Sequence, residues 1–103
     1  MQDFRKLMKQ AKEMQERMAQ MQEQLSREEV DGSAGGGMVT VRMNGRHEIV
    51  KVTIDKQVVD PEDVEMLEDL IAAAVNDART KVEEKMQGEM GKLTGGLGMP
   101  GLF

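Results

Sequence analysis

The residues that could carry out chemistry are few and widely separated in this 103-residue chain. His47 is the only histidine, Ser26 and Ser33 are the only serines, and there is no cysteine. Nucleophilic catalysis needs a nucleophile, a base and a group that orients the base, all within reach of one another. We therefore expect no enzymatic activity, no catalytic residue and no small-molecule substrate.

Two further segments resemble ligand sites, and each has a simpler explanation. The carboxylates of Asp60, Glu62, Asp63 and Glu65 could bind a hard cation, but acidic residues are also favoured at the start of a helix. The glycine run 35–37 lacks the lysine of a phosphate-binding loop, and it precedes a predicted strand instead of following one. We expect no metal site and no cofactor.

The composition limits the class of protein and its partners. The chain has 14 Lys and Arg against 19 Asp and Glu, so any site for a polyanion must be a local basic patch. Aromatic residues make up 2%, which argues against stacking on single-stranded nucleic acid. The absence of cysteine is compatible with a reducing compartment. The longest apolar run, residues 70–75, is far shorter than the roughly 20 residues of a membrane span. We expect one domain, a cytoplasmic location and no membrane partner.

The first 27 residues predict a long helix. Residues 3–27 contain neither glycine nor proline, and apolar residues recur at alternating steps of three and four: Phe4, Leu7, Ala11, Met14, Met18, Met21 and Leu25. This stripe could pack on its own domain or on a partner chain. It could also hold amphipathic helices of other proteins, because methionine surfaces suit adaptable binding. A dimeric protein-binding adaptor is therefore an alternative function.

The middle of the chain predicts a small antiparallel sheet. Residues 28–30 form a possible edge strand, and residues 32–37 form a flexible glycine-rich break. Alternation places Val39, Val41 and Met43 on one face, and it does the same for Val50, Val52 and Ile54. A two-residue turn at Asn44-Gly45 or Gly45-Arg46 joins the two runs into a hairpin with one apolar face.

The second half predicts another long helix, with Asp60 as its N-cap and Pro61 in its first position. Its middle is apolar nearly all round, more than one sheet face can cover. A second copy of the chain is the simplest cover. The predicted homodimer interface contains Leu67, Leu70, Ile71, Ala74 and Val75. The pattern weakens at Gly88 and Gly91, so we expect a domain over residues 1–90 and a flexible glycine-rich tail over residues 91–103.

Charge is concentrated at two places. Residues 1–12 carry Arg5, Lys6, Lys9 and Lys12 against Asp3, whereas residues 60–69 carry six acids and no base. Cations in the first turns of a helix oppose its dipole, and such a conflict is expected where an anionic partner compensates it. The alternative is a solvated helix face with the spaced pairs Lys9–Glu13 and Lys12–Glu16.

Four segments together resemble the bacterial YbaB/EbfC nucleoid-associated proteins. They are the Met- and Gln-rich opening at residues 8–15, the run from Gly35 through Met38-Val39 to Asn44-Gly45, the segment 59–70, and residues 73–78 with the tail 90–98. The resemblance implies an α+β fold of order α-β-β-β-α: a long N-terminal helix, a small three-stranded antiparallel sheet and a long C-terminal helix. It also implies a homodimer whose long helices project like the arms of tweezers.

The same resemblance implies a function. Members bind double-stranded DNA with low sequence specificity, alter its conformation, and contribute to nucleoid organisation and gene regulation. The first 90 residues would then form the DNA-binding and dimerisation domain, located in the nucleoid. Contacts with DNA are attributed to the helical arms, which in this sequence points to the basic residues Arg5, Lys6, Lys9, Lys12, Arg79, Lys81 and Lys85.

Overall fold

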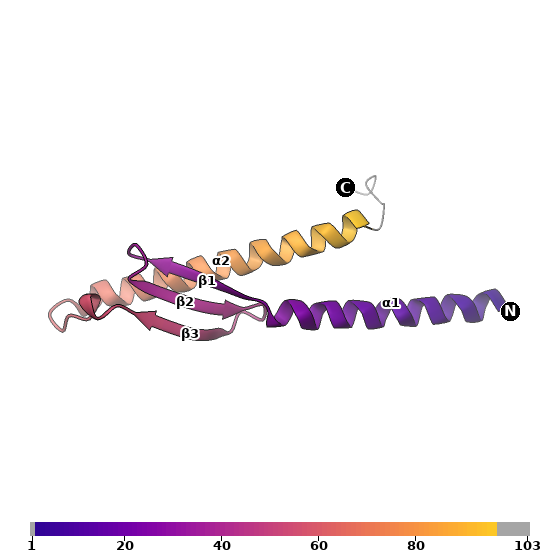
Figure 1. Ribbon diagram of the computed structural model, residues 1–103, viewed down its shortest axis with the longest axis horizontal. Helices are drawn as coiled ribbons and strands as arrows, with labels where there is room; N and C mark the ends of the chain where they lie inside the picture. Colours follow the sequence, from indigo (N-terminus) through magenta and orange to yellow (C-terminus); the bar gives the residue numbers. More distant parts are fainter. Residues whose placement is uncertain (1, 97–103) are drawn as a thin grey trace.

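The computed structural model describes residues 2–96, which form two long helices and a three-stranded sheet. Their order is α1 (Gln2–Arg27), β1 (Glu29–Ala34), β2 (Val39–Asn44), β3 (Ile49–Ile54), the short 3-10 helix η1 (Lys56–Val58) and α2 (Val64–Gly96). The sheet is antiparallel with β2 in the middle. Both helices extend beyond the same end of the sheet (Figure 1). The predicted α-β-β-β-α order is confirmed.

Helix α1 is an arm that leaves the domain. Its last apolar residue, Leu25, is buried, whereas Phe4 and Leu7 are 67% and 62% exposed. Met14 and Met18 are also exposed. Of the two alternatives for the stripe, packing on its own domain does not hold for most of the helix, because only the end of α1 reaches the sheet (Figure 1).

Strand β1 is longer than the sequence indicates, and the glycine-rich break is shorter. Gly32, Ser33 and Ala34 pair with Val41, Thr40 and Val39 of β2. The connecting turn covers residues 35–38, and its three glycines, Gly35, Gly36 and Gly37, each have a positive φ that favours glycine. The assignment of Gly32 to the break is wrong, because its role is to make room for α2 and this role leaves no local signal.

The β2–β3 connection is a four-residue loop over residues 45–48, so both predicted two-residue turns are wrong. The Asn44 amide donates to the Glu48 carbonyl over 3.0 Å, and the Asn44 side-chain oxygen accepts from the amides of Arg46 and Glu48. The register shifts at Arg42/Met43, which pairs Met43 with Ile49 and skips Val50. The side chain of Asn44 therefore organises a longer loop.

Helix α2 begins and ends later than predicted. Asp63 accepts a hydrogen bond from the Met66 amide over 3.2 Å and caps the helix, while Asp60 accepts from Glu62 in the preceding turn. The assignment of Asp60 as N-cap and Pro61 as first helical residue is therefore wrong. The helix continues through Gly88 and Gly91 to Gly96, and the rest of the predicted tail lies outside the described residues.

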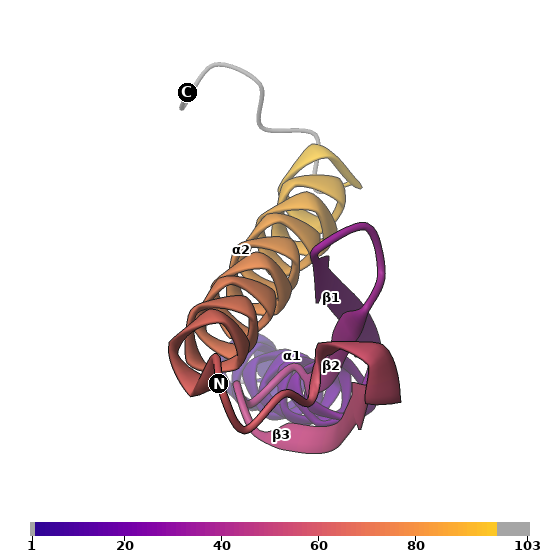
Figure 2. The same cartoon turned by 90° about the vertical axis from the view of Figure 1, so that its left-hand side faces the viewer.

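The core lies between α2 and two of the three strands. Helix α2 crosses one face of the sheet over β1 and β2 (Figure 2). Val39 and Val41 of β2 and Ala74, Ala78 and Val82 of α2 are almost completely buried. Val52 of β3 is paired with Val41 but remains 43% exposed, because α2 does not cover β3.

Candidate nucleic-acid interface

A basic tip occupies the first three turns of α1. We define it as Arg5, Lys6, Lys9 and Lys12; all four are exposed, and none belongs to an ion pair of the described residues. With about 100° of rotation per residue, Arg5, Lys9 and Lys12 fall within one narrow arc of the helix. This arc lies on the side opposite the apolar stripe. The tip therefore presents cations to solvent on one helical face.

The pairs Lys9–Glu13 and Lys12–Glu16, considered as the alternative to an anionic partner, are not among the ion pairs of the described part of the chain. The ion pair that α1 does contain joins Arg27 to Glu23 over 2.8 Å at the other end of the helix. The basic tip consequently keeps its charge uncompensated within residues 2–96, and an anionic ligand would not first have to displace a carboxylate.

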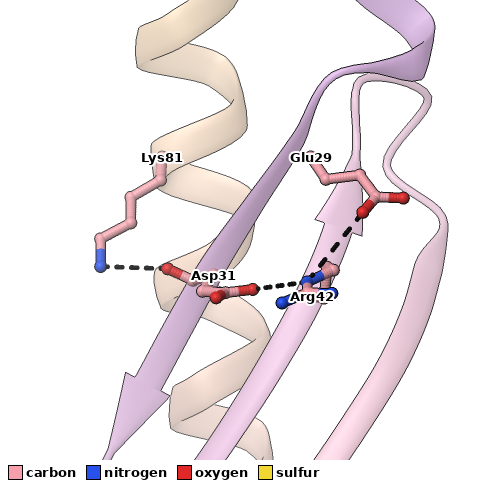
Figure 3. A network of polar contacts seen from close by, with 4 residues as sticks. All are labelled: Glu29, Asp31, Arg42 and Lys81. Atoms are coloured by element: carbon pink, nitrogen blue, oxygen red, sulfur yellow. Dashed lines mark hydrogen bonds and ion pairs between the residues drawn. The ribbon is translucent and has the colours of Figure 1, made fainter.

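Lys81 and Lys85, which the family resemblance assigns to DNA, have partners within the domain. Lys81 contacts Asp77 over 3.0 Å and donates to the Asp31 carbonyl of β1 over 3.2 Å (Figure 3). Lys85 contacts Glu28, next to β1, over 3.3 Å. Both lysines therefore fasten α2 to β1, and a phosphate would have to compete with these partners.

Contacts between α2 and β1, and between β1 and β2, shift the pKa values of Asp77 and Arg42. The pKa of Asp77 lies below its ordinary value because the carboxylate accepts the Ser33 amide over 2.9 Å and also contacts Lys81. The pKa of Arg42 lies above its ordinary value because its guanidinium donates to Asp31 over 3.0 Å, with Glu29 at 4.0 Å (Figure 3). The charge of Arg42 is thus compensated by the carboxylates of β1.

Arg79, the remaining predicted DNA contact, is exposed and belongs to none of the ion pairs found within residues 2–96. It lies about 200° around α2 from Asp77, on the side away from the contacts to β1. The structure thus separates Arg79 from the basic tip of α1.

The predicted interface residues fall into three groups. Ala74 is completely buried within the single chain, so its side chain belongs to the core. Leu70 faces the glycine turn, since a Cβ on Gly35 would lie 2.9 Å from its Cδ2. Ile71 and Val75 are half-buried and lie around α2 from Asp77 and Lys81, which contact β1, and Leu67 is also half-buried.

The uncovered strand supplies apolar residues that the sequence analysis does not assign to an interface. Val50 and Val52 of β3 are 49% and 43% exposed, and Ile71 and Val75 of α2 are only half-buried against the core. We define these four residues as the β3–α2 surface. The alternation of β3 indicates its apolar face, but nothing in the sequence shows that α2 leaves it bare.

The other features that the sequence raises show no built site. His47 lies in the exposed loop between β2 and β3 and has a left-handed backbone with φ of 64°. Its Nε2 lies 3.9 Å from Oε1 of Glu83 on α2. The described residues contain no cluster of three or more His, Cys, Asp or Glu suited to a metal ion. Within the same part of the chain, neither long helix is apolar enough to span a membrane.

Comparison with known proteins decides the family. The sequence profile of the YbaB/EbfC DNA-binding family matches residues 1–97. The chain belongs to the YbaB/EbfC family. A nucleoid-associated protein of Syntrophobacter fumaroxidans is 58% identical over 95 residues, covering 92% of this chain and 86% of the relative. One of Afipia carboxidovorans is 57% identical over 102 residues, covering 99% and 97%.

A solved structure of the same shape comes from Helicobacter pylori. The crystal structure of an uncharacterized protein of that organism matches with a TM-score of 0.71 and 28% identity, covering 85% of this chain and 92% of the other. YbaB/EbfC membership points to DNA binding and away from catalysis. It does not favour the adaptor function considered for the methionine stripe.

Proposed function

We propose that this YbaB/EbfC protein is a nucleoid-associated protein that binds double-stranded DNA through the basic tips of α1. The observation that carries the proposal is the presence of four exposed cations, Arg5, Lys6, Lys9 and Lys12, without carboxylate partners among the described residues, on an arm that stands clear of the domain. Lysine and arginine neutralise phosphates and release counterions, which supplies affinity even to a protein of negative net charge.

The binding unit in this proposal is a homodimer joined through the β3–α2 surface. Val52, which pairs with Val41 of the apolar face of β2, is 43% exposed in the single chain, and Val50 on the same strand is 49% exposed. Covering this face with its own copy buries apolar surface on both chains and places two arms in one particle. Leu67, next to this surface, would contribute at its edge.

Two arms whose cations contact phosphates account for low sequence specificity. Phosphate contacts fix the position of a protein on DNA but carry no sequence information. The basic tip contains no Asn and no aromatic residue, and the two arms would grip the duplex from two sides. Holding the duplex at two points would alter its conformation, which is how the protein would contribute to nucleoid organisation and gene regulation.

The test is duplex DNA binding at several salt concentrations. If four to six phosphates are neutralised per dimer, the logarithm of affinity should fall against that of salt with a slope of about −4 to −5. The triple variant Lys6→Gln/Lys9→Gln/Lys12→Gln should bind more weakly, with a flatter slope and unchanged dimerisation.

A charge-matched control separates local from overall charge. Arg46→Gln/Lys51→Gln/Lys56→Gln removes the same three charges from exposed positions on and around the β2–β3 hairpin. This control should bind DNA nearly as well as the parent. Equal losses in the two variants, or a salt-independent affinity, would exclude the basic tip as the binding site.

A further inference from the structure

From Phe4 to Met18 the apolar stripe of α1 is exposed within the described chain, and only Leu25 at its end is buried by the domain. Phe4, Leu7, Met14 and Met18 are 67%, 62%, 54% and 45% exposed. An isolated helix is marginally stable in water, and a contiguous exposed apolar patch usually marks an interface. The stripe therefore requires a cover from outside this chain.

The spacing of the stripe specifies a helix as that cover. Steps of three and four residues from Phe4 to Leu25 are those of a heptad seam, in which two helices pack side by side. The DNA-binding candidates lie outside this seam: Arg5, Lys6, Lys9 and Lys12 occupy the outer positions of the heptad. A second helix can thus cover the stripe without touching the basic tip.

The positions that flank the seam favour a second copy of α1. They are Met8, Gln10, Gln15, Arg17, Gln22 and Gln24, so five of the six are uncharged. Like charges at flanking positions prevent a helix from pairing with itself, and opposite charges select a different partner. Here neither effect operates, and the seam is complementary to its own copy.

The geometry of α1 also indicates whether the second copy of α1 belongs to the same dimer or to another one. The basic arc and the apolar stripe lie on opposite sides of α1, because their centres differ by about 180° at 100° per residue. When the arms hold a duplex through the basic tips, as the proposed function requires, the stripes face away from that duplex. They then meet the arms of other dimers.

We infer that the stripe joins neighbouring dimers by pairing α1 of one dimer with α1 of the next. Each chain then has two self-complementary contacts, the β3–α2 surface within the dimer and the α1 stripe between dimers. Two different self-complementary contacts per chain link dimers into larger assemblies, either a closed tetramer or an open array. Dimers bound along one duplex, or on two duplexes, are thereby linked, and binding becomes cooperative.

The first experiment removes the apolar seam and leaves the basic tip intact. Leu7→Gln/Met14→Gln/Met18→Gln replaces exposed apolar residues by a good helix former. In sedimentation at tens of micromolar, the parent should form species larger than the dimer, and the variant should remain a dimer. On long duplex DNA the Hill coefficient should fall from above 1 to 1, while binding to a short duplex that holds one dimer is unchanged.

A conservative control keeps the seam apolar. Met14→Leu/Met18→Leu should assemble and bind cooperatively like the parent. A parent protein that never exceeds the dimer, with or without DNA, would overturn the inference. The proposed function would survive that result, because it is tested separately by the lysine variants and by binding to the short duplex.

Cysteine cross-linking identifies the partner surface, since the chain contains no cysteine of its own. Met14→Cys in the seam should form disulfides that link dimers into larger particles, alone if the helices are parallel, or in a mixture of Leu7→Cys and Met18→Cys if they are antiparallel. Gln20→Cys, on the outer side of α1, should not. Links confined to one dimer, or links from Met14→Cys to Met90→Cys of α2, would overturn the pairing of α1 between dimers.

Discussion

Gly32 of β1 lies directly against Ala78 of α2, with no room for a side chain between them. A Cβ on Gly32 would come within 2.6 Å of the Ala78 Cα and would also press on the Ala74 carbonyl. This close approach brings α2 into reach of the β1 backbone, where Asp77 accepts the Ser33 amide and Lys81 donates to Asp31. The close distance between α2 and β1 therefore depends on Gly32, which has no side chain to keep the helix away from the strand.

Gly32→Ala should destabilise the protein. The added methyl group would meet helix backbone, which moves less readily than a side chain, so α2 must shift away from β1 and loosen the core around Ala74 and Ala78. Overpacking of this kind costs typically about 1–3 kcal/mol. Urea unfolding followed by circular dichroism measures the loss.

The control for this variant is Gly88→Ala. Gly88 lies in α2, and a Cβ added there would meet nothing within 4 Å, so replacing it by alanine should stabilise the helix by about 0.5–1 kcal/mol. The two substitutions add the same methyl group and should shift the unfolding midpoint in opposite directions. A Gly32→Ala protein as stable as the parent would show that α2 is not held at this distance.

The elements of the fold follow from the sequence because each is encoded locally. The seam from Phe4 to Leu25 defines α1, and the alternation around Val41 and Val52 defines two strands. The errors fall where tertiary contacts decide. Gly32 resembles a loop residue until α2 is placed over it, and Asn44-Gly45 resembles a tight turn until the Asn44 side chain accepts two amides of a longer loop.

For the candidate site, too, the sequence could not predict the features that depend on tertiary contacts. The exposure of the basic tip could be anticipated, because Lys6 and Lys9 lie off the apolar stripe of one helix. The ion pairs of Lys81 and Lys85 could not, since their partners Asp31 and Glu28 are about 50 residues away in the chain. Residue type identifies a cation, but only the fold shows whether its charge is already compensated.

Lys81→Gln should lower stability but not DNA binding, whereas Lys9→Gln should lower DNA binding but not stability. Lys81 joins α2 to β1, so its loss should lower the unfolding midpoint and leave DNA affinity at low salt nearly unchanged. Lys9 has no carboxylate partner among the described residues, so its loss should weaken DNA binding without a change in stability. Thermal unfolding and a gel-shift titration of both variants measure the two effects. Loss of DNA affinity in Lys81→Gln at unchanged stability would instead place Lys81 on the DNA.

Stability should decrease in acid through Asp77. Its pKa in the folded protein is lower than its ordinary value of 3.8, so the ionised carboxylate stabilises the fold. This contribution is fully present above the ordinary value, and it is lost as the pH falls through the lowered pKa of the folded state. Urea midpoints measured from pH 6 to pH 2 should fall less steeply for Asp77→Asn than for the parent. Parallel profiles for the two proteins would show that Asp77 is not involved.

Val52→Lys should separate the dimer into folded single chains. Val52 is already 43% exposed in one chain, so a lysine there is tolerated by the fold but places a charge in the β3–α2 surface when two copies meet. Sedimentation at micromolar concentration should show a dimer for the parent and a monomer for the variant, with unchanged circular dichroism. Thr53→Lys, which adds the same charge on the opposite face of β3, should remain a dimer.

On a short duplex the salt slope of Val52→Lys should be about half that of the parent, because a single arm neutralises half as many phosphates. A Val52→Lys protein that remains a dimer would show that the chains associate through another surface.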